Sequence, residues 1–374
     1  MPAPSRLLAV HVVPGGHSAP QSKVTDTVAG LLGGSAGEER VLRRIHANAG
    51  VDTRSLVLPL EAYGTLDGFG TANDTWLEHA PRLAVEVVNG ALAQAGVDAA
   101  EVDVVVSTTV TGIAVPSLEA RIAAEVGFRE DVVRVPLFGL GCVAGAAGIA
   151  RVHDLLAGRP DGVAVLLAVE LCSLTVQQGD ASRANMVASG LFGDGAAAVV
   201  LAGPERRAPV SVPAPSSPAL PPSHAPHLTV VASRSRLYPD THRAMGWDVG
   251  DGGLGIVLGA EVPDLVTQNV GADVRAFLAD HGLAPQDIAF HVAHPGGPKV
   301  LEAMQGALGV PREALGLTWD SLAEVGNLSS VSVLHVLGKT LAERPPDPGQ
   351  YGLLLAMGPG FCAELVLLRC EDAA

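Results

Sequence analysis

The sequence predicts an α/β protein in which helices cover largely parallel or mixed sheets. Short runs rich in Val, Leu and Ala alternate with longer segments of helical periodicity along most of the chain. Hydrophobic residues make up 48% of the 374 residues and aromatic residues only 3%, so the core must be mainly aliphatic. Both halves of the chain show the same alternation and end in strands. We therefore expect a duplicated unit, although no direct sequence repeat is visible.

In the first half, the longest helix is predicted at residues 75–97, where Leu77, Leu83 and Val87 belong to a broad apolar face. Residues 104–109 begin with three consecutive valines, a pattern typical of a strand that is buried on both faces. In chain order, we expect strand 6–13, helices 24–34, 37–49 and 75–97, strand 104–109, helix 116–126, strand 132–137, a helix from Cys142 to Leu156, and strands 163–169 and 196–202.

A change in composition separates the two halves. Eight prolines lie between Pro204 and Pro226, counting both ends, and such a segment cannot bury much surface. We therefore assign residues 1–203 to a first half, 204–226 to a proline-rich linker and 227–374 to a second half. In the second half we expect strands 228–233 and 256–258, helix 263–280, strand 288–293, helices 298–308 and 328–343, and strands 352–357 and 365–368.

The charge balance argues against several classes of partner. With 39 acidic and 24 basic residues, the formal net charge is −15, which is unsuited to nucleic acid and to anionic membrane surfaces. No apolar run reaches transmembrane length, and the N-terminus lacks the pattern of a signal peptide. The four cysteines show neither a metal-type pair nor a disulfide pattern. We therefore expect a cytoplasmic protein without a metal site and without membrane insertion.

The stretch around Cys142 carries the first candidate for chemistry. The strand at 132–137 is followed by turns at Gly139 and Gly141 and then by a helix rich in small residues, so Cys142 lies where that helix begins. The first N–H groups of a helix favour an anion, and we therefore expect a lowered pKa and a nucleophilic thiolate. Gly141 and Gly145 are expected to leave room for a substrate. The alternative is an inert cysteine in a packed core.

Three further motifs lie in the second half, and each lies at the end of an element beside glycines. His294 follows a strand, Asn327 precedes a helix, and Gly358-Pro359 interrupts a strand. Taken singly, they would be a packed histidine, a helix N-cap and a turn. Taken together with Cys142, they indicate thiolate catalysis with an oxyanion hole, because a thiol and an imidazole activate each other and two hydrogen-bond donors stabilise an enolate or oxyanion.

With these motifs, the chain resembles the bacterial type III polyketide synthases. They are the chalcone synthase-like family of the thiolase superfamily. The resemblance implies a duplicated, five-layered αβαβα thiolase fold, a homodimer, and a catalytic triad of Cys142, His294 and Asn327. The motifs that carry it occur in the family's order and spacing: Gly141-Cys142-Val-Ala-Gly145, Glu170-Leu-Cys-Ser-Leu-Thr175, Leu191-Phe192-Gly-Asp-Gly195, His294-Pro-Gly-Gly-Pro298, Gly326-Asn327-Leu-Ser-Ser330 and Gly358-Pro359-Gly360.

The resemblance also implies the chemistry. Cys142 takes an acyl group from an acyl-CoA, malonyl-CoA loses CO₂ at His294 and Asn327, and the resulting carbanion extends the bound acyl group by a decarboxylative Claisen condensation. No metal and no cofactor is implied, because the CoA thioesters are substrates. One oxyanion donor typically contributes ~3–4 kcal/mol to such a step.

Further positions are assigned roles by the same resemblance. Phe192 is expected to stand between a CoA tunnel and the cavity, although simple core packing would also explain it. Arg43 and Arg44 lie where tunnel-mouth cations are found, but a position that is often basic in plant members is Asn48 here, and a solvated helix face remains the alternative. Gly296 and Gly297 are expected to let CoA pass close to the backbone. The expected cavity residues are Val110, Thr111, Thr175, Ile256, Gly358 and Pro359, with Val115 reaching the partner's cavity.

The sequence predicts the identity of the acyl starter less clearly than it predicts the type of reaction. Ile256 occupies the position of a second gatekeeping Phe in plant members, and the missing bulk favours a medium- or long-chain acyl starter and an alkylpyrone or alkylresorcinol product. Val110 and Thr175 stand where bacterial tetrahydroxynaphthalene synthases often have cysteines, which argues against synthesis from malonyl-CoA alone. A malonyl-primed synthase of that type is kept as the alternative. A condensing enzyme like ketoacyl synthase III and a non-catalytic scaffold are further alternatives. The former should have a basic docking surface, and the latter should lack a triad residue.

Overall fold

The computed structural model describes residues 3–206 and 227–372. Most of the linker predicted at 204–226 therefore lies outside the described residues, and the boundaries of the two halves stay a prediction. The first half contains β1 (Ser5–Pro14), β2 (His17–Pro20), α1 (Gln21–Leu32), α2 (Ala36–Ala47), β3 (Thr53–Leu56), α3 (Gly68–Ala95), β4 (Val104–Thr108), α4 (Leu118–Val126), β5 (Val133–Leu137), α5 (Ala144–Leu156), β6 (Val163–Leu171), α6 (Arg183–Leu191) and β7 (Asp194–Ala202).

The second half repeats the pattern. It contains β8 (His227–Leu237), β9 (Met245–Gly250), β10 (Gly253–Leu258), α7 (Val262–Ala279), β11 (Ile288–Ala293), α8 (Pro298–Leu308), α9 (Gly316–Val325), α10 (Ser330–Glu343), β12 (Tyr351–Gly358) and β13 (Cys362–Glu371). Short 3₁₀ turns connect several of these elements, and one of them, Gly141–Val143, runs directly into α5.

The strand order shows an internal duplication. The described strands follow the order β5-β4-β6-β7-β1 in the first half and β11-β12-β13-β8 in the second. In the first half, β4 pairs in parallel with both β5 and β6, and in the second half β11 pairs in parallel with β12. The remaining pairs of these strands are antiparallel. The two sets meet only where β1 and β8 share two residue pairs. By this correspondence, α5 and α10 are equivalent helices.

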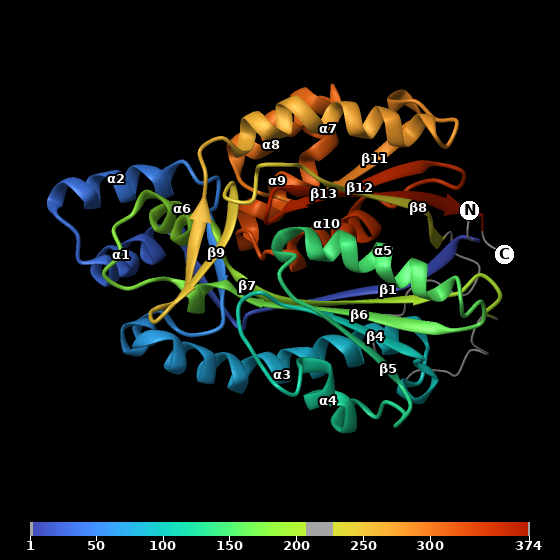
Figure 1. Ribbon diagram of the computed structural model, residues 1–374, viewed down its shortest axis with the longest axis horizontal. Helices are drawn as coiled ribbons and strands as arrows, with labels where there is room; N and C mark the ends of the chain where they lie inside the picture. The colour runs from blue at the N-terminus through green and yellow to red at the C-terminus, as the bar shows by residue number, and fades with distance from the viewer. Residues whose placement is uncertain (1–2, 207–226, 373–374) are drawn as a thin grey trace.

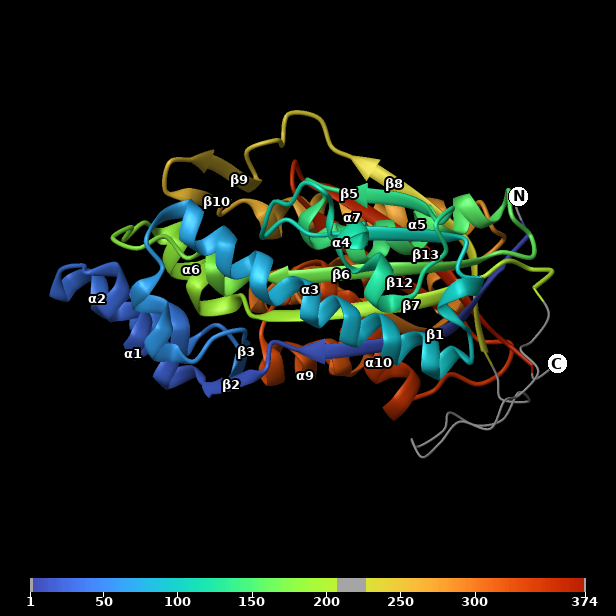
Figure 2. The ribbon, with the colours of Figure 1, turned by 90° about the horizontal axis from the view of Figure 1, so that it is seen from below.

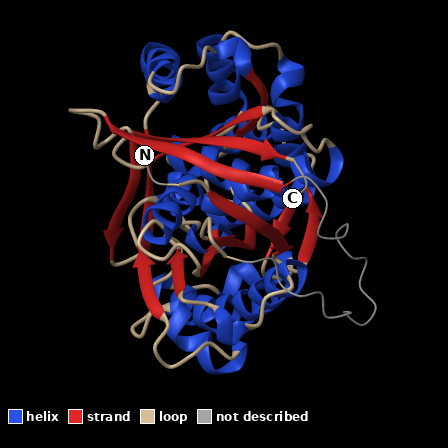
Figure 3. Cartoon of the chain, turned by 90° about the vertical axis from the view of Figure 1, so that its right-hand side faces the viewer, coloured by secondary structure: helices blue, strands red, loops and turns tan. Residues whose placement is uncertain are grey.

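The elements stack in the five αβαβα layers that the resemblance implies. Helices α3 and α4 cover the outer face of the first sheet, α7 and α8 cover the outer face of the second, and α5 and α10 lie between them (Figures 1 and 2). Helices therefore form both outer surfaces and the centre, with the strands between them (Figure 3). Strands β4, β6 and β7 are buried on both faces, as expected for residues 104–109. Val165 and Leu167 of β6 belong to the outer core, and Leu166 between them belongs to the central one.

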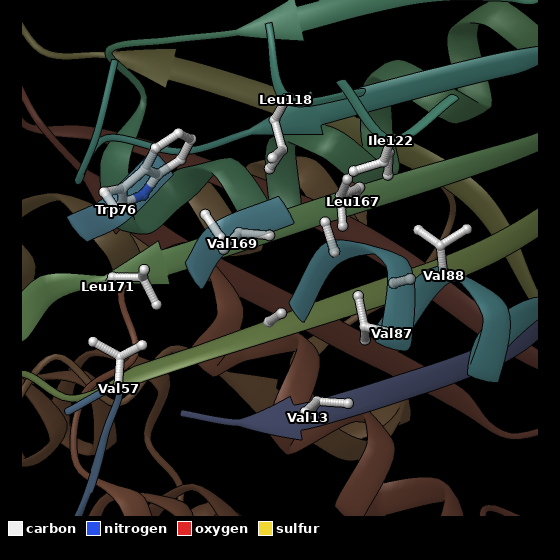
Figure 4. Close-up of a cluster of buried hydrophobic side chains, with 14 of the residues drawn as sticks. Val13, Val57, Trp76, Val87, Val88, Leu118, Ile122, Leu167, Val169 and Leu171 are labelled. Carbon is white, nitrogen blue, oxygen red and sulfur yellow. The ribbon is translucent and has the colours of Figure 1, made fainter. Parts of the chain in front are cut away.

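The outer core of the first half contains the largest buried side chain. Trp76 of α3 lies at one end of a layer of aliphatic residues from β1, β6 and α4 and is fully buried (Figure 4).

Within the described residues, no helix is both long and apolar enough to cross a membrane.

Some elements differ from the sequence prediction. Helix α3 begins at Gly68, earlier than the predicted residue 75, and it continues through Pro81. Helices α6 and α9 and strands β2, β3 and β9 were not predicted. Helix α6 is short and contains Ser and Gly near its end, and α9 begins with a glycine, so both lack a clear propensity signal. Several residues of each helix are buried, so tertiary packing stabilises α6 and α9 instead.

Helices α5 and α10 approach each other closely at Gly145. A Cβ atom added there would lie 2.2 Å from the carbonyl oxygen of Ser330 and 2.6 Å from the side chain of Val333. The expectation that Gly145 leaves room for a substrate is therefore wrong. Its missing side chain is used for helix packing, which brings the beginnings of α5 and α10 together.

We expect Gly145→Ala to lower the free energy of unfolding by about 1–3 kcal/mol, because the new methyl group would overlap the α10 backbone. The matched control is Gly306→Ala in exposed α8, where a Cβ atom would meet nothing within 4 Å. That variant should gain about 0.4–1 kcal/mol from reduced chain entropy. Chemical denaturation measures both. Equal shifts in the two variants would contradict this account of Gly145.

Candidate active site

One cavity lies where the two halves meet. Its wall is built from corresponding positions of the duplicated unit. Val110 follows β4 and His294 follows β11, while Cys142 precedes α5 and Asn327 precedes α10. The carboxyl ends of parallel strands and the beginnings of the following helices are the usual location of ligand sites in α/β folds. The structure thus brings the three predicted triad residues to one cavity.

Cys142 lies in the 3₁₀ turn that leads into α5, as the sequence predicted for a residue at the start of the helix. The turn is possible because Gly141 adopts a positive φ of 54°, and because a Cβ atom there would lie 2.8 Å from the ring of Pro359. The Sγ atom of Cys142 donates a hydrogen bond to Oγ of Ser329, 3.7 Å away. Ser329 immediately precedes α10, so each central helix contributes its beginning to this contact.

A buried carboxylate, Glu170, organises the groups behind the thiol. Its Oε2 accepts hydrogen bonds from the backbone N–H of Val110 and the hydroxyl of Thr111, both at 3.1 Å. Its Oε1 accepts from the hydroxyls of Ser329, at 3.3 Å, and Ser330, at 2.6 Å. Burial raises the pKa of Glu170 to about 7, although these four donors oppose the shift. Glu170 therefore connects the loop after β4 to the beginning of α10.

The amide of Asn327 has a defined orientation. Its Oδ1 accepts from the backbone N–H of Ser329 at 2.8 Å and from the hydroxyl of Ser332 at 3.4 Å. The oxygen is thus occupied, and Nδ2 is the part of the amide left to donate into the cavity. His294 is 3% exposed, and its Nδ1 has no hydrogen-bond partner among the described residues. Two donor groups can therefore serve an oxyanion at this place.

The thiol and the imidazole are both neutral in the resting site. Burial raises the pKa of Cys142 to about 12, against the lowering effect of its hydrogen bond to Ser329. Burial also lowers the pKa of His294 to about 3. The lowered thiol pKa that we expected from the helix start is therefore wrong for this state, because removal from water disfavours the charged form of each group. A nucleophilic thiolate requires proton transfer when substrate arrives.

Phe192 and Asn327 are held side by side by backbone pairing. The N–H of Asn327 donates to the carbonyl of Leu191 at 2.8 Å, and the N–H of Gly193 donates to the carbonyl of Asn327 at 2.9 Å. A side chain at Gly193 would meet two backbone oxygens within 3 Å, so this pairing depends on the glycine. Phe192 lines the main cavity and also a smaller neighbouring pocket.

Other predicted site residues divide into two groups. Val110, Ile256, Gly296 and Pro359 line the main cavity, and Thr175 lines the smaller pocket. The second group does not line either space and contains Thr111, Val115, Gly297, Gly358, Arg43 and Arg44.

The members of the second group have other contacts. Thr111 directs its hydroxyl to Glu170, and it also accepts a hydrogen bond from the backbone of Leu171. A Cβ atom at Gly358 would lie 2.6 Å from the carbonyl oxygen of Leu140, so this glycine fits the turn around Cys142 rather than a substrate. Gly297 caps the start of α8 with a φ of 123°.

The basic residues expected to bind CoA lie on α2 and are exposed. Arg43 forms ion pairs with Asp26 and Glu39, both at 2.8 Å, so its charge is already balanced in this structure. Val115 lies on an outer loop with 90% of its surface exposed.

Sequence reasoning missed two important wall residues, Cys172 and Trp247, which line both spaces. Trp247 of β9 is directly opposite Ile256 of β10 in a two-stranded sheet, and directly opposed residues share a face. The sequence placed Ile256 in the cavity but did not predict the β9–β10 hairpin. Recognition of that hairpin would also have placed Trp247, the cross-strand partner of Ile256, in the cavity wall. Cys172 follows β6 at the position that corresponds to Pro359 after β12, a signal that becomes visible only with the duplicated topology.

Comparisons with known proteins match the chain over nearly its whole length. The family model "FAE1/Type III polyketide synthase-like protein" matches residues 20–210, and "Chalcone and stilbene synthases, C-terminal domain" matches residues 229–371. A 1,3,6,8-tetrahydroxynaphthalene synthase of Streptomyces peucetius subsp. caesius is 51% identical over 363 residues, which cover 96% of this chain and 92% of the relative. The chain belongs to the bacterial type III polyketide synthases.

More distant members of this family agree. The "Alpha-pyrone synthesis polyketide synthase-like Pks18" of Mycobacterium tuberculosis is 30% identical over 93% of this chain and 86% of its own length. The crystal structure of 1,3,6,8-tetrahydroxynaphthalene synthase from Streptomyces coelicolor A3(2) superimposes with a TM-score of 0.89 at 28% identity, covering 98% of this chain and all of that one. This type III polyketide synthase is thus an acyltransferase with the thiolase-like α/β fold, and its family implies CoA thioesters as substrates.

The raised pKa of Glu170 predicts a pH-dependent stability. The folded state binds the Glu170 proton more tightly than the unfolded state, so the contribution to stability is full below about pH 4 and is lost as pH rises through 7. In the Glu170→Gln variant, the side-chain amide at position 170 does not titrate. We expect the unfolding free energy of the wild type, relative to Glu170→Gln, to fall by on the order of 2–3 kcal/mol between pH 5 and pH 8.

Denaturation at several pH values measures this difference. Asp194, whose pKa burial raises to about 6, is present in both proteins and therefore largely cancels. A constant or increasing difference over this pH range would show that Glu170 is charged in the folded protein without penalty.

Proposed function

We propose that this enzyme is a malonyl-primed synthase of the tetrahydroxynaphthalene type, which makes a hydroxylated naphthalene from malonyl-CoA alone. The observation that carries the proposal is the 51% identity to a 1,3,6,8-tetrahydroxynaphthalene synthase over 96% of the chain, compared with 30% for the α-pyrone relative. This favours the alternative that the sequence left open over the long-chain acyl starter that it preferred.

The cavity wall supports a small starter. The preference for a long chain depended on the absence of a bulky side chain at Ile256, but the indole of Trp247 lies opposite Ile256 on the same face of the hairpin. Both residues line the main cavity as well as the smaller pocket, together with Phe192 and Cys172. A long alkyl tail would have to pass this cluster, whereas a malonyl or acetyl unit need not.

The proposed reaction begins at Cys142. As its Sγ attacks the thioester carbon, the thiol proton moves to His294, the C–S bond to CoA breaks, and CoA leaves with the proton from His294. A second malonyl-CoA then loses CO₂, and the electron pair of the broken C–C bond moves into an enolate. His294 and Nδ2 of Asn327 donate to the enolate oxygen. The enolate carbon attacks the acyl group on Cys142, and the Cys142 thiolate is released for reloading with the extended chain.

CoA is proposed to approach over α2, with its pantetheine arm near Gly296 and Gly297. Arg44 is exposed on that helix, and Arg43 would exchange its carboxylate partners for phosphate. The proposed gate, Phe192, stands at the wall between the cavity and the smaller pocket.

The decisive test is incubation with labelled malonyl-CoA, with and without a panel of acyl-CoAs, and identification of products by mass spectrometry. We expect a naphthalene-type product from malonyl-CoA alone and no faster reaction with long-chain starters. Trp247→Ala should raise the share of products from longer starters, because it removes side-chain volume beside Ile256. Val249→Ala, on the same strand but 68% exposed, is the matched control and should change nothing. Cys142→Ala should abolish every product.

Two results would reject the malonyl-primed assignment. The first is a faster conversion of long-chain acyl-CoA to alkylpyrones by the wild type. The second is an unchanged starter profile in Trp247→Ala, which would remove the structural support for a restricted cavity.

We also propose a homodimer formed along β5. This strand is at the edge of the sheet and pairs only with β4 among the described strands. Val115 is 90% exposed and Phe138 60% exposed, and both lie in the segments that flank this edge. The Val115 loop is held in place, because Asn73 hydrogen-bonds to both backbone groups of Ile113. A preformed apolar loop beside an open sheet edge is suited to a second copy of the chain.

The oligomeric state tests this proposal. Light scattering after size exclusion should give a dimer for the wild type and a monomer for Val115→Glu or Phe138→Glu, because each places a charge in the apolar contact. Val249→Glu alters an exposed apolar residue elsewhere and should remain dimeric. A fully active wild-type monomer would exclude a partner contribution to the site.

A further inference from the structure

A buried arginine outside the cavity closes the end of a helix that leads into it. Arg54 of β3 is 2% exposed. One guanidinium nitrogen donates to the backbone carbonyls of Ser189, at 2.9 Å, and Phe192, at 2.6 Å. The other donates to the carbonyl of Gly190, at 2.7 Å, and to the side-chain oxygen of Gln21, at 2.6 Å. All four partners are carbonyl oxygens.

These contacts complete the C-terminus of α6. The last carbonyls of a helix have no partners within it, and a cation is favoured at that end. Here Arg54 takes the carbonyls of Ser189 and Gly190, and the N–H of Asn327 takes that of Leu191. Burial lowers the pKa of Arg54 to about 10, so the group is still a cation at neutral pH. Phe192, the first residue after α6, is fixed through its own carbonyl.

Arg54 also contacts the end of α9. Gly326 follows α9 with a φ of 80°, and a Cβ atom there would lie 3.0 Å from Cδ of Arg54 and 2.8 Å from the carbonyl of Leu191. The N–H of Asp52, just before β3, donates to the carbonyl of Ala323 in α9 at 2.8 Å. Arg54 therefore lies between the ends of α6 and α9. Phe192 follows α6 directly, and Asn327 follows Gly326 at the end of α9. These two residues are joined by backbone pairing at the cavity wall.

We propose that Arg54 is a positioning residue that fixes the amide of Asn327 and the ring of Phe192 relative to each other. The planar guanidinium donates to four carbonyl oxygens at once, which the single ammonium of Lys cannot reproduce. Without it, the two segments lose their common anchor, and an oxyanion donor displaced by about 1 Å loses much of its effect. This inference rests on the role proposed for Asn327 in decarboxylation.

The test separates two partial reactions of the intact enzyme. Acylation of Cys142 by malonyl-CoA is followed by the mass of the protein at short mixing times, and decarboxylation is followed by the release of labelled CO₂ from malonyl-CoA. In Arg54→Lys we expect acylation to stay within about threefold of the wild type while decarboxylation falls by at least about tenfold, because the donor of Asn327 serves only the second step. Failure of the wild type to carry out either reaction would instead reject the proposed function.

The matched control is Arg151→Lys on α5. Arg151 also joins separate elements, donating to Glu364 at 3.3 Å and Ser235 at 3.4 Å, but it does not contact the Phe192 or Asn327 segments. It should leave the ratio of the two rates unchanged. All variants are assayed well below their melting temperatures.

A second variant keeps the test decisive if Arg54→Lys does not fold. Gln21→Leu removes one partner of Arg54 and also the donor to the carbonyl of Gly190 at 2.8 Å. It should show a smaller loss with the same selectivity for decarboxylation. An equal loss of both reactions, a loss of neither, or a greater loss of acylation would overturn the positioning role.

Discussion

The close contact between the two central helices is the constraint on which the rest of the structure depends. Helices α5 and α10 come from equivalent places in the two halves, and they touch where Gly145 lies against the carbonyl of Ser330. Because both helices begin at this contact, a residue placed just before each of them reaches the same small volume. Cys142 precedes one helix and Asn327 the other, and the loops after β4 and β11 add Val110 and His294. The candidate active site thus follows from the internal duplication, although no equivalent pair of its residues is chemically alike.

The frame of the site is built from buried ionisable groups whose hydrogen bonds are nearly all satisfied. Glu170 binds four donors behind the thiol, and Arg54 binds four acceptors behind Phe192. Asp194 accepts from the backbone N–H groups of Ser173, at 2.8 Å, and Val57, at 2.7 Å. A satisfied polar network in a dry environment is rigid, and the same dryness keeps the thiol and the imidazole neutral until a substrate is present. Exclusion of water therefore explains both the rigidity of the polar network and the neutral state of Cys142 and His294.

Much of this arrangement could be predicted from the sequence, and the limits have identifiable causes. The strands with uninterrupted valine and leucine, and the helices with a clear apolar face, were found because their periodicity is strong. Cys142, His294 and Asn327, which the structure brings to one cavity, were singled out because each lies in a glycine-flanked motif. Helices α6 and α9 were missed because packing rather than propensity forms them, and Trp247 was missed because its place depends on the hairpin register. The protonation of Cys142 was misjudged because a helix start is visible in the sequence, whereas the extent of desolvation is a property of the folded cavity.

The β9–β10 hairpin forms a two-stranded sheet of its own, separate from the nine strands of the main sheet. Its residues Trp247 and Ile256 shape the cavity, but neither belongs to the three clusters that form the hydrophobic core. A different side chain at either position changes the cavity wall without removing a residue from those clusters. At these two positions the cavity wall and the hydrophobic core are therefore built from separate sets of side chains.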